Sequence, residues 1–160
     1  MAEHIYFLLF LYSSQTLLGQ VFGRNKPVYD QFDFEVLGTP NFEIYHYLQN
    51  EGVLEEIANW SEHWYRLHQV VLRDTIKGQN PVVLYNDHPD FQQTNTIQGA
   101  IGTGTGGVTE AFKNRVIQPF AMSNQQTHHV LGHELVHAFQ YNLILKNDSM
   151  SLQNLANVPL

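Results

Sequence analysis

The run from Thr127 to Lys146 constrains most strongly what this chain can fold into. It contains no proline, and its apolar residues recur at three- and four-residue steps, which predicts an α-helix. One side of this helix carries Leu131, Leu135, Ala138 and Phe139, and further apolar residues flank the other side. A helix that is apolar over most of its surface is buried. We therefore expect a central helix that packs against the rest of the fold.

Three polar residues interrupt this helix in the order His133-Glu134-Leu135-Val136-His137, an H-E-x-x-H motif. Residues four apart lie on the same face of a helix, so both imidazoles can point at one zinc ion. Glu134 lies about 100° further round, where its carboxylate can take a proton from a metal-bound water. The alternative is a hydrogen-bonded pair of core histidines. Because zinc accounts for all three polar residues, we predict His133 and His137 as ligands and Glu134 as the general base.

A catalytic zinc site needs a third protein ligand beside the two histidines. The longer H-E-x-x-H-x-x-G-x-x-H pattern fails, since Gln140 and Leu143 replace its glycine and last histidine. His129 lies one turn before His133, but about 12 Å of helix rise separates it from His137, too far to share one ion. The ligand therefore has to come from elsewhere.

The chain after the motif contains no glutamate, and its one later carboxylate is Asp148. We therefore expect an amino-terminal part of a longer protein, with the third zinc ligand beyond Leu160.

A resemblance points the same way. The run HVLGHELVHAFQY, from His129 to Tyr141, resembles the active helix of bacterial gluzincin-type zinc metallopeptidase domains, as found ahead of TolB-like β-propellers in secreted proteins. The similarity extends upstream through 106–110 and 114–120 and covers about residues 25–160. The resemblance implies a zinc-binding glutamate in a later segment, and a carboxy-terminal β-propeller in the same protein.

The amino terminus predicts export. Ile5 to Tyr12 is an apolar run too short to span a membrane, typical of the core of a secretory signal, with cleavage near Gly19 or Gln20. The preceding residues include no Lys or Arg, so a buried amino-terminal helix is the alternative. We predict a signal peptide over residues 1–20, a periplasmic or secreted protein, and an incomplete metallopeptidase-like domain over residues 24–160.

The charge and cysteine content of the chain limit which partners and metal sites can be expected. With 8 Lys and Arg, a net charge of −7 and no basic cluster, the chain is not expected to bind nucleic acid or an anionic membrane surface. Cysteine is absent, which excludes disulfides and thiolate metal sites.

The remaining pattern predicts an α+β fold. Two alternating runs, 31–37 and 41–48, flank Gly38-Thr39-Pro40 and indicate a β-hairpin. A long amphipathic helix follows over 50–77, and further strands are expected over 82–85, 108–112 and 115–120. Another helix should begin over 150–156. The expected architecture is a small, mostly antiparallel sheet with a long packing helix and a zincin active-site helix.

Two connections carry possible sites. The segment 86–98 contains Asp87, His88 and Asp90, for which turn formation is a better explanation than a second metal site. The segment from Gly99 to Gly107 lacks the lysine of a phosphate-binding loop, but its glycines allow close backbone approach. We expect it to border the cleft, beside an edge strand to which a substrate peptide could pair.

These observations predict an exported zinc metallopeptidase that acts on peptides or proteins. The alternative is a non-catalytic envelope or secreted interaction module that retains a zincin scaffold. A signalling or envelope-binding protein without metal would require the motif to be accidental.

Overall fold

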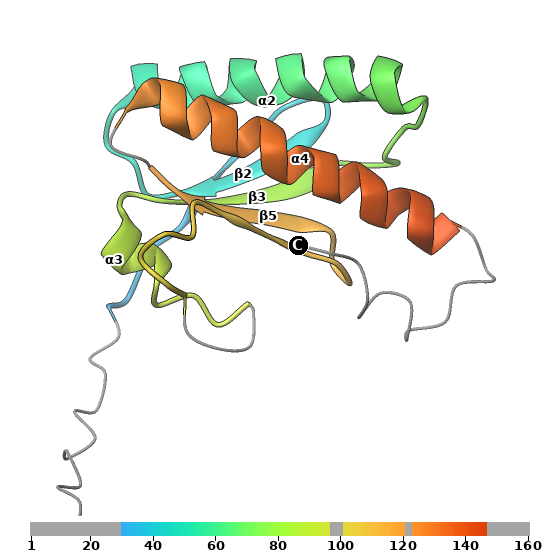
Figure 1. Cartoon of the computed structure of the whole chain (residues 1–160). Coiled ribbons are helices and arrows are strands. Elements are labelled where there is room, and N and C mark those ends of the chain that lie inside the picture. Colours follow the sequence, from blue (N-terminus) through green and yellow to red (C-terminus); the bar gives the residue numbers. More distant parts are fainter. Residues whose placement is uncertain (1–29, 97–100, 121–122, 147–160) are drawn as a thin grey trace, which may run out of the picture.

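The computed structural model of this chain describes residues 30–96, 101–120 and 123–146 (Figure 1). Its helices and strands follow one another as β1 (Glu35–Gly38), β2 (Phe42–His46), α2 (Glu51–Leu72), β3 (Asn80–Tyr85), α3 (His88–Phe91), β4 (Val108–Glu110), β5 (Arg115–Pro119) and α4 (Asn124–Lys146). The predicted signal peptide over 1–20 and the predicted helix over 150–156 lie outside the described residues. No helix in the described ranges is both long enough and apolar enough to cross a membrane.

The strands form one five-stranded sheet in the order β1-β2-β3-β5-β4. The two outer pairs, β1 with β2 and β4 with β5, are antiparallel, whereas β2 with β3 and β3 with β5 are parallel. The α+β class is confirmed, but the sheet is mixed rather than mostly antiparallel. The reason is that α2 carries the chain back between β2 and β3, and a helical crossover joins parallel strands.

The predicted hairpin is confirmed as β1 and β2, and α2 holds its turn in place. Glu62 of α2 accepts hydrogen bonds from the hydroxyl of Thr39 at 2.8 Å, the amide of Asn41 at 2.9 Å and its side chain at 2.7 Å. One carboxylate thus satisfies three donors at the point where the chain reverses, which fixes the register of the hairpin against the helix.

Helix α2 is shorter than the predicted range of 50–77. Asn50 caps it by accepting from the backbone amides of Gly52 and Val53, as an Asn at this position should. It ends at Leu72, where Arg73 caps it in a left-handed conformation with φ of 52°, and does not continue to Gly78. The segment that follows α2 is tied to the end of α4 rather than continuing the helix.

That tie is made by Asp74, whose carboxylate accepts from Lys146 and from Asn142, each at 2.5 Å. Burial raises the pKa of Asp74, but the hydrogen bonds from Lys146, from the Thr75 backbone and from Asn142 together outweigh it. The pKa therefore lies below the ordinary value of 3.8. The carboxylate consequently holds the carboxy-terminal turn of α4 against the end of α2.

Helices α2 and α4 lie side by side over one face of the sheet, and α3 lies on the opposite face (Figure 1). The core between the helices and the sheet includes the predicted helix residues Leu131, Leu135, Ala138 and Phe139, all 0% exposed. The opposite face is covered by an aromatic group that includes Phe32, Phe34, Tyr47, Tyr85 and Phe91. One face of the sheet is thus covered by the two long helices, one of which carries the motif, and the other face is covered by aromatic side chains.

Candidate active site

Helix α4 brings the two motif histidines together as their spacing predicts. Their Nε2 atoms lie 3.2 Å apart, with ring centroids 4.8 Å apart. Two nitrogen lone pairs can approach this closely only if a proton or a cation lies between them. Zinc–nitrogen bonds of about 2.0–2.1 Å in tetrahedral geometry would place the two nitrogens about 3.3–3.4 Å apart. The separation of the two nitrogens is therefore close to the one that a single zinc ion would require.

Gln140 orients the second of these rings. Its side-chain oxygen lies 2.9 Å from Nδ1 of His137. An amide oxygen can only accept, so Nδ1 carries the proton and Nε2 presents a lone pair. Metal-ligating histidines characteristically donate their other ring N–H in this way, which fixes the tautomer and raises ligand basicity. Sequence reasoning treated Gln140 only as a departure from a longer motif.

Glu134 lies between α4 and the sheet and is only 7% exposed. The hydroxyl of Thr109, in the edge strand β4, lies 2.7 Å from Oε2 of Glu134 and 3.0 Å from its backbone oxygen. Burying a carboxylate is costly unless a donor compensates it, and Thr109 is that donor. The spacing of the motif could not reveal this contact, because the two residues belong to different elements.

A cleft of about 750 Å³ opens between the motif face of α4 and the glycine segment leading into β4. Its lining comes from Gly104 to Thr109 on one side and from His129, Val130, His133, Glu134 and His137 on the other. The expectation that this glycine segment borders the cleft is therefore correct. The histidine rings face open space and not the apolar core, since His133 is exposed and His137 half-buried.

Gly107 allows the edge of the sheet to approach the helix this closely. A Cβ atom at Gly107 would lie 2.9 Å from Cγ of Glu134, 3.0 Å from Val130 and 3.3 Å from Gln118. Real Cβ atoms essentially never make a contact as short as the first, and the other two are tight, so a side chain here would displace the stem of Glu134. Gly104 lines the same cleft but has nothing within 4 Å of a Cβ position.

The opposite flank of α4 packs against α2 through an aromatic cluster. The indole N–H of Trp64 donates to the backbone oxygen of His128 at 3.1 Å, and Nε2 of His68 donates to that of Gly132 at 2.9 Å. The rings of Trp64 and His68 are stacked at 5.4 Å. These contacts fix the position of α4 relative to α2 immediately before the motif begins.

Tyr141 lies one turn beyond the second histidine, with ring centroids 6.5 Å apart. Burial raises the pKa of the Tyr141 hydroxyl, and the negative charge of Glu134 raises it further. Tyr141 is thus a neutral, buried residue at the carboxy-terminal end of the motif.

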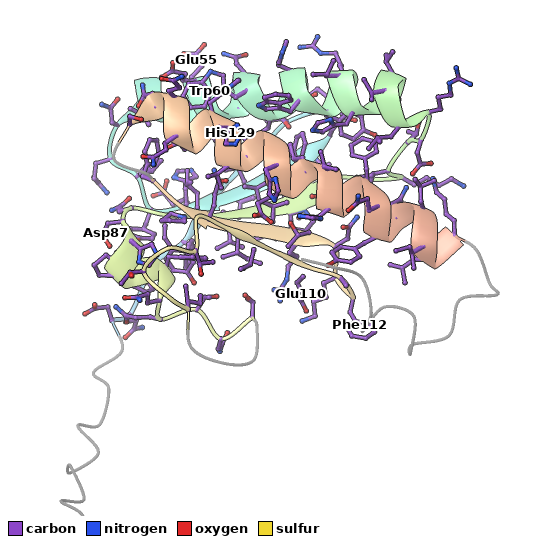
Figure 2. The ribbon with its side chains drawn as sticks, viewed as in Figure 1. Glu55, Trp60, Asp87, Glu110, Phe112 and His129 are labelled. Atoms are coloured by element: carbon purple, nitrogen blue, oxygen red, sulfur yellow. The ribbon has the colours of Figure 1, made fainter. Side chains whose placement is uncertain are left out.

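Within the described ranges, no group of three or more His, Cys, Asp or Glu side chains is arranged to hold a metal ion. His129 lines the cleft one turn before the motif, on the amino-terminal half of α4 (Figure 2). A complete zinc site would therefore require a ligand from outside the described residues, and the assignments of His133, His137 and Glu134 remain predictions.

The described part of the polar segment, residues 86–96, consists of bends, the short helix α3 and a turn, and its side chains make the local bonds that its composition indicates. Asp87 caps the short helix α3 by accepting from the amide of Asp90 at 2.9 Å, and Asp90 itself accepts from Tyr47 at 2.5 Å. His88 lies 3.1 Å from the backbone oxygen of Thr105 through Nε2, which ties α3 to the glycine segment. These side chains are engaged in local structure, and Figure 2 shows Asp87 beside α3, away from α4.

Gln118 in β5 is a buried polar residue that sequence reasoning missed. It is 0% exposed, and neither its side-chain oxygen nor its nitrogen has a hydrogen-bond partner in the described structure. It neighbours Gly107, where a Cβ atom would lie 3.3 Å from its own Cβ. An unpaired buried amide is costly, and nothing in the alternation of the strand signals it.

Comparisons of this chain with protein-family models, with curated proteins and with solved structures found no match. The functional inference therefore depends on the geometry of the cleft.

Proposed function

We propose that the full-length protein is an exported, zinc-dependent peptide hydrolase of the gluzincin type. The observation that carries this proposal is the convergence of the two Nε2 atoms, 3.2 Å apart, in an open cleft that Glu134 also lines. A structural histidine pair has no need of a cleft, whereas a hydrolase needs one to admit a peptide chain.

In this proposal, each residue of the motif has a separate role. His133 and His137 would hold zinc through Nε2, with Gln140 fixing the tautomer of the second ring. Zinc, when bound, supplies a polarised substrate carbonyl and a water of lowered pKa. The Glu134 carboxylate would accept the proton from that water and return it to the leaving amine.

The edge of the sheet offers a place for the substrate. Strand β4 ends the strand order, so one of its edges has no neighbouring strand in the described structure, and Val108 and Thr109 line the cleft. A peptide in extended conformation could pair with this edge, as in strand addition. Its scissile bond would then lie across the motif face of α4.

The test uses the full-length protein and matched variants on one face of α4. Wild-type protein should contain one zinc per chain by elemental analysis and should cleave a pool of internally quenched peptides. His133→Ala and His137→Ala should lose the metal, whereas His129→Ala, one turn away in the same cleft, should keep it. Glu134→Gln should keep zinc and lose hydrolysis. Hydrolysis that persists in Glu134→Gln would reject the assigned base.

The second candidate is a non-catalytic interaction module that retains this scaffold, and the lack of a three-residue ligand group among the described residues favours it. In this candidate the histidines are structural, so it predicts that the full-length protein cleaves no peptide and that His133→Ala lowers the stability of the fold without changing its zinc content. The two proposals therefore give opposite results in the same zinc and cleavage assays.

Export is a separate part of the proposal, supported by the apolar run from Ile5 to Tyr12. Amino-terminal sequencing of the protein recovered from the periplasm or medium should show cleavage near Gly19 or Gln20. Recovery from the cytoplasm with residues 1–20 intact would refute it.

A further inference from the structure

Thr109 and Glu134 are each 7% exposed and contact each other across the boundary between β4 and α4. The Thr109 hydroxyl has one proton to donate and two acceptors in reach, Oε2 of Glu134 at 2.7 Å and the backbone oxygen of Glu134 at 3.0 Å. The charged carboxylate is the stronger acceptor of the two. The hydroxyl therefore donates chiefly to the end of the Glu134 side chain, while it lies close to the backbone oxygen of the same residue.

A free glutamate side chain samples many rotamers, because three of its bonds rotate. Here the end of the side chain is restrained, because its Oε2 is bound by Thr109. Its Cγ lies beside Gly107, at a point where a Cβ atom would be only 2.9 Å away. No second donor to the carboxylate is present in the described structure, and Glu134 is one of the residues that line the cleft.

We propose that Thr109 is a positioning residue that holds one carboxylate oxygen of Glu134 and thereby presents the other to the cleft. This rests on the proposed function, because it assigns to Thr109 the orientation of the general base. Thr109 lies in the edge strand, so the strand that would bind the substrate also orients the base.

A purely structural explanation also exists, since β-branched residues favour strands. Valine serves that purpose equally well and has nearly the same shape as threonine, but it lacks the hydroxyl. Serine keeps the hydroxyl and loses the branch. The pair Thr109→Val and Thr109→Ser therefore separates the hydrogen bond from the strand preference.

The experiment measures zinc content, kcat, KM and urea unfolding in the full-length protein. Thr109→Val should keep its zinc and a KM within about twofold, while kcat falls on the order of 10- to 100-fold, as expected for a misplaced catalytic group. Thr109→Ser should recover most of kcat. In metal-free protein, Thr109→Val should unfold at lower urea concentration than Thr109→Ser, and this difference should become smaller when Glu134 is replaced by Ala, which leaves only the backbone oxygen as acceptor.

The outcomes distinguish the two proposals. If wild-type protein cleaves peptides and Thr109→Val keeps its kcat, the role of Thr109 is wrong and the proposed function stands. If zinc-loaded wild-type protein cleaves nothing, both are wrong. Loss of zinc in Thr109→Val would also overturn the positioning role, because the hydroxyl would then act on the ligands. Should Thr109→Val fail to fold, Thr109→Ala replaces it in the same comparison with Thr109→Ser.

Discussion

Replacing Gly132 by alanine should push α4 away from α2. A Cβ atom at Gly132 would lie 2.5 Å from Cε2, 2.7 Å from Cζ2 and 2.8 Å from Cδ2 of the Trp64 indole. The indole cannot move aside easily, because its N–H is bonded to the backbone oxygen of His128 and its ring is stacked on His68. Relief of the contact therefore requires α4 itself to shift.

The expected cost follows from two opposing effects. Overpacking of a well-packed core costs about 1–3 kcal/mol, and three overlapping atoms of a rigid ring place this case at the upper end. Alanine is better than glycine in a helix by about 1 kcal/mol, which offsets part of the cost. The free energy of unfolding should therefore fall by about 2 kcal/mol. For a chain of this size, that corresponds to a decrease in Tm of about 4–8 °C.

Urea unfolding followed by circular dichroism would measure this change. Gly52→Ala is the matched control, because this helical glycine has nothing closer than 3.4 Å to a Cβ position, and it should not destabilise the fold. In a Trp64→Leu background, Gly132→Ala should cost much less, since the two changes share one contact. If Gly132→Ala were as stable as wild type in the Trp64 background, the packing argument would be refuted.

Three further predictions concern the cleft and the fold around it. Gly107→Ala should lower peptide turnover roughly 10- to 100-fold by displacing Glu134, whereas Gly104→Ala should not; equal turnover in both variants would contradict this. Gln118→Met should raise the free energy of unfolding by about 1 kcal/mol, because it removes two unpaired polar atoms. A lower free energy of unfolding than wild type, measured in urea, would indicate that a bound water satisfies Gln118. The pKa of Asp74 is depressed in the folded state, so its contribution to stability is present above the unfolded value of 3.8 and is lost as pH falls below it. The difference in urea midpoint between wild type and Asp74→Asn should accordingly shrink in acid, and a difference that grew there would refute the assignment.

The sequence predicted α4 and the placement of its histidines correctly, because a helical period fixes which residues share a face whatever surrounds them. It was less successful for α2. In this helix, predicted to be amphipathic, the apolar residues Leu67 and Val71 are 41% and 65% exposed, while the polar residues Ser61 and His68 are buried. His68 is buried because its ring bonds to the backbone of α4, a partner that no periodicity in α2 can indicate.

The parts of the site that escaped prediction are contacts between elements. Thr109 reads as an ordinary strand residue, and Gln140 as an ordinary helix surface residue, until α4 and β4 are brought together. The mixed sheet escaped for a similar reason, since strand alternation indicates which side chains face the core but not which strand is the neighbour. Each of these features depends on tertiary distances between residues well separated in sequence.

The two glycines on either side of the motif show how the fold sets the geometry of the site. Gly132 lets α4 approach α2 directly before His133, and Gly107 lets the sheet edge approach α4 directly at Glu134. A side chain at Gly132 would move the whole helix, so it should weaken zinc binding and turnover together. A side chain at Gly107 would press on the stem of Glu134 and on Val130 but on neither histidine, so zinc affinity should be retained while turnover falls. Measured together, the two alanine variants therefore separate the placement of the ligands from the placement of the base.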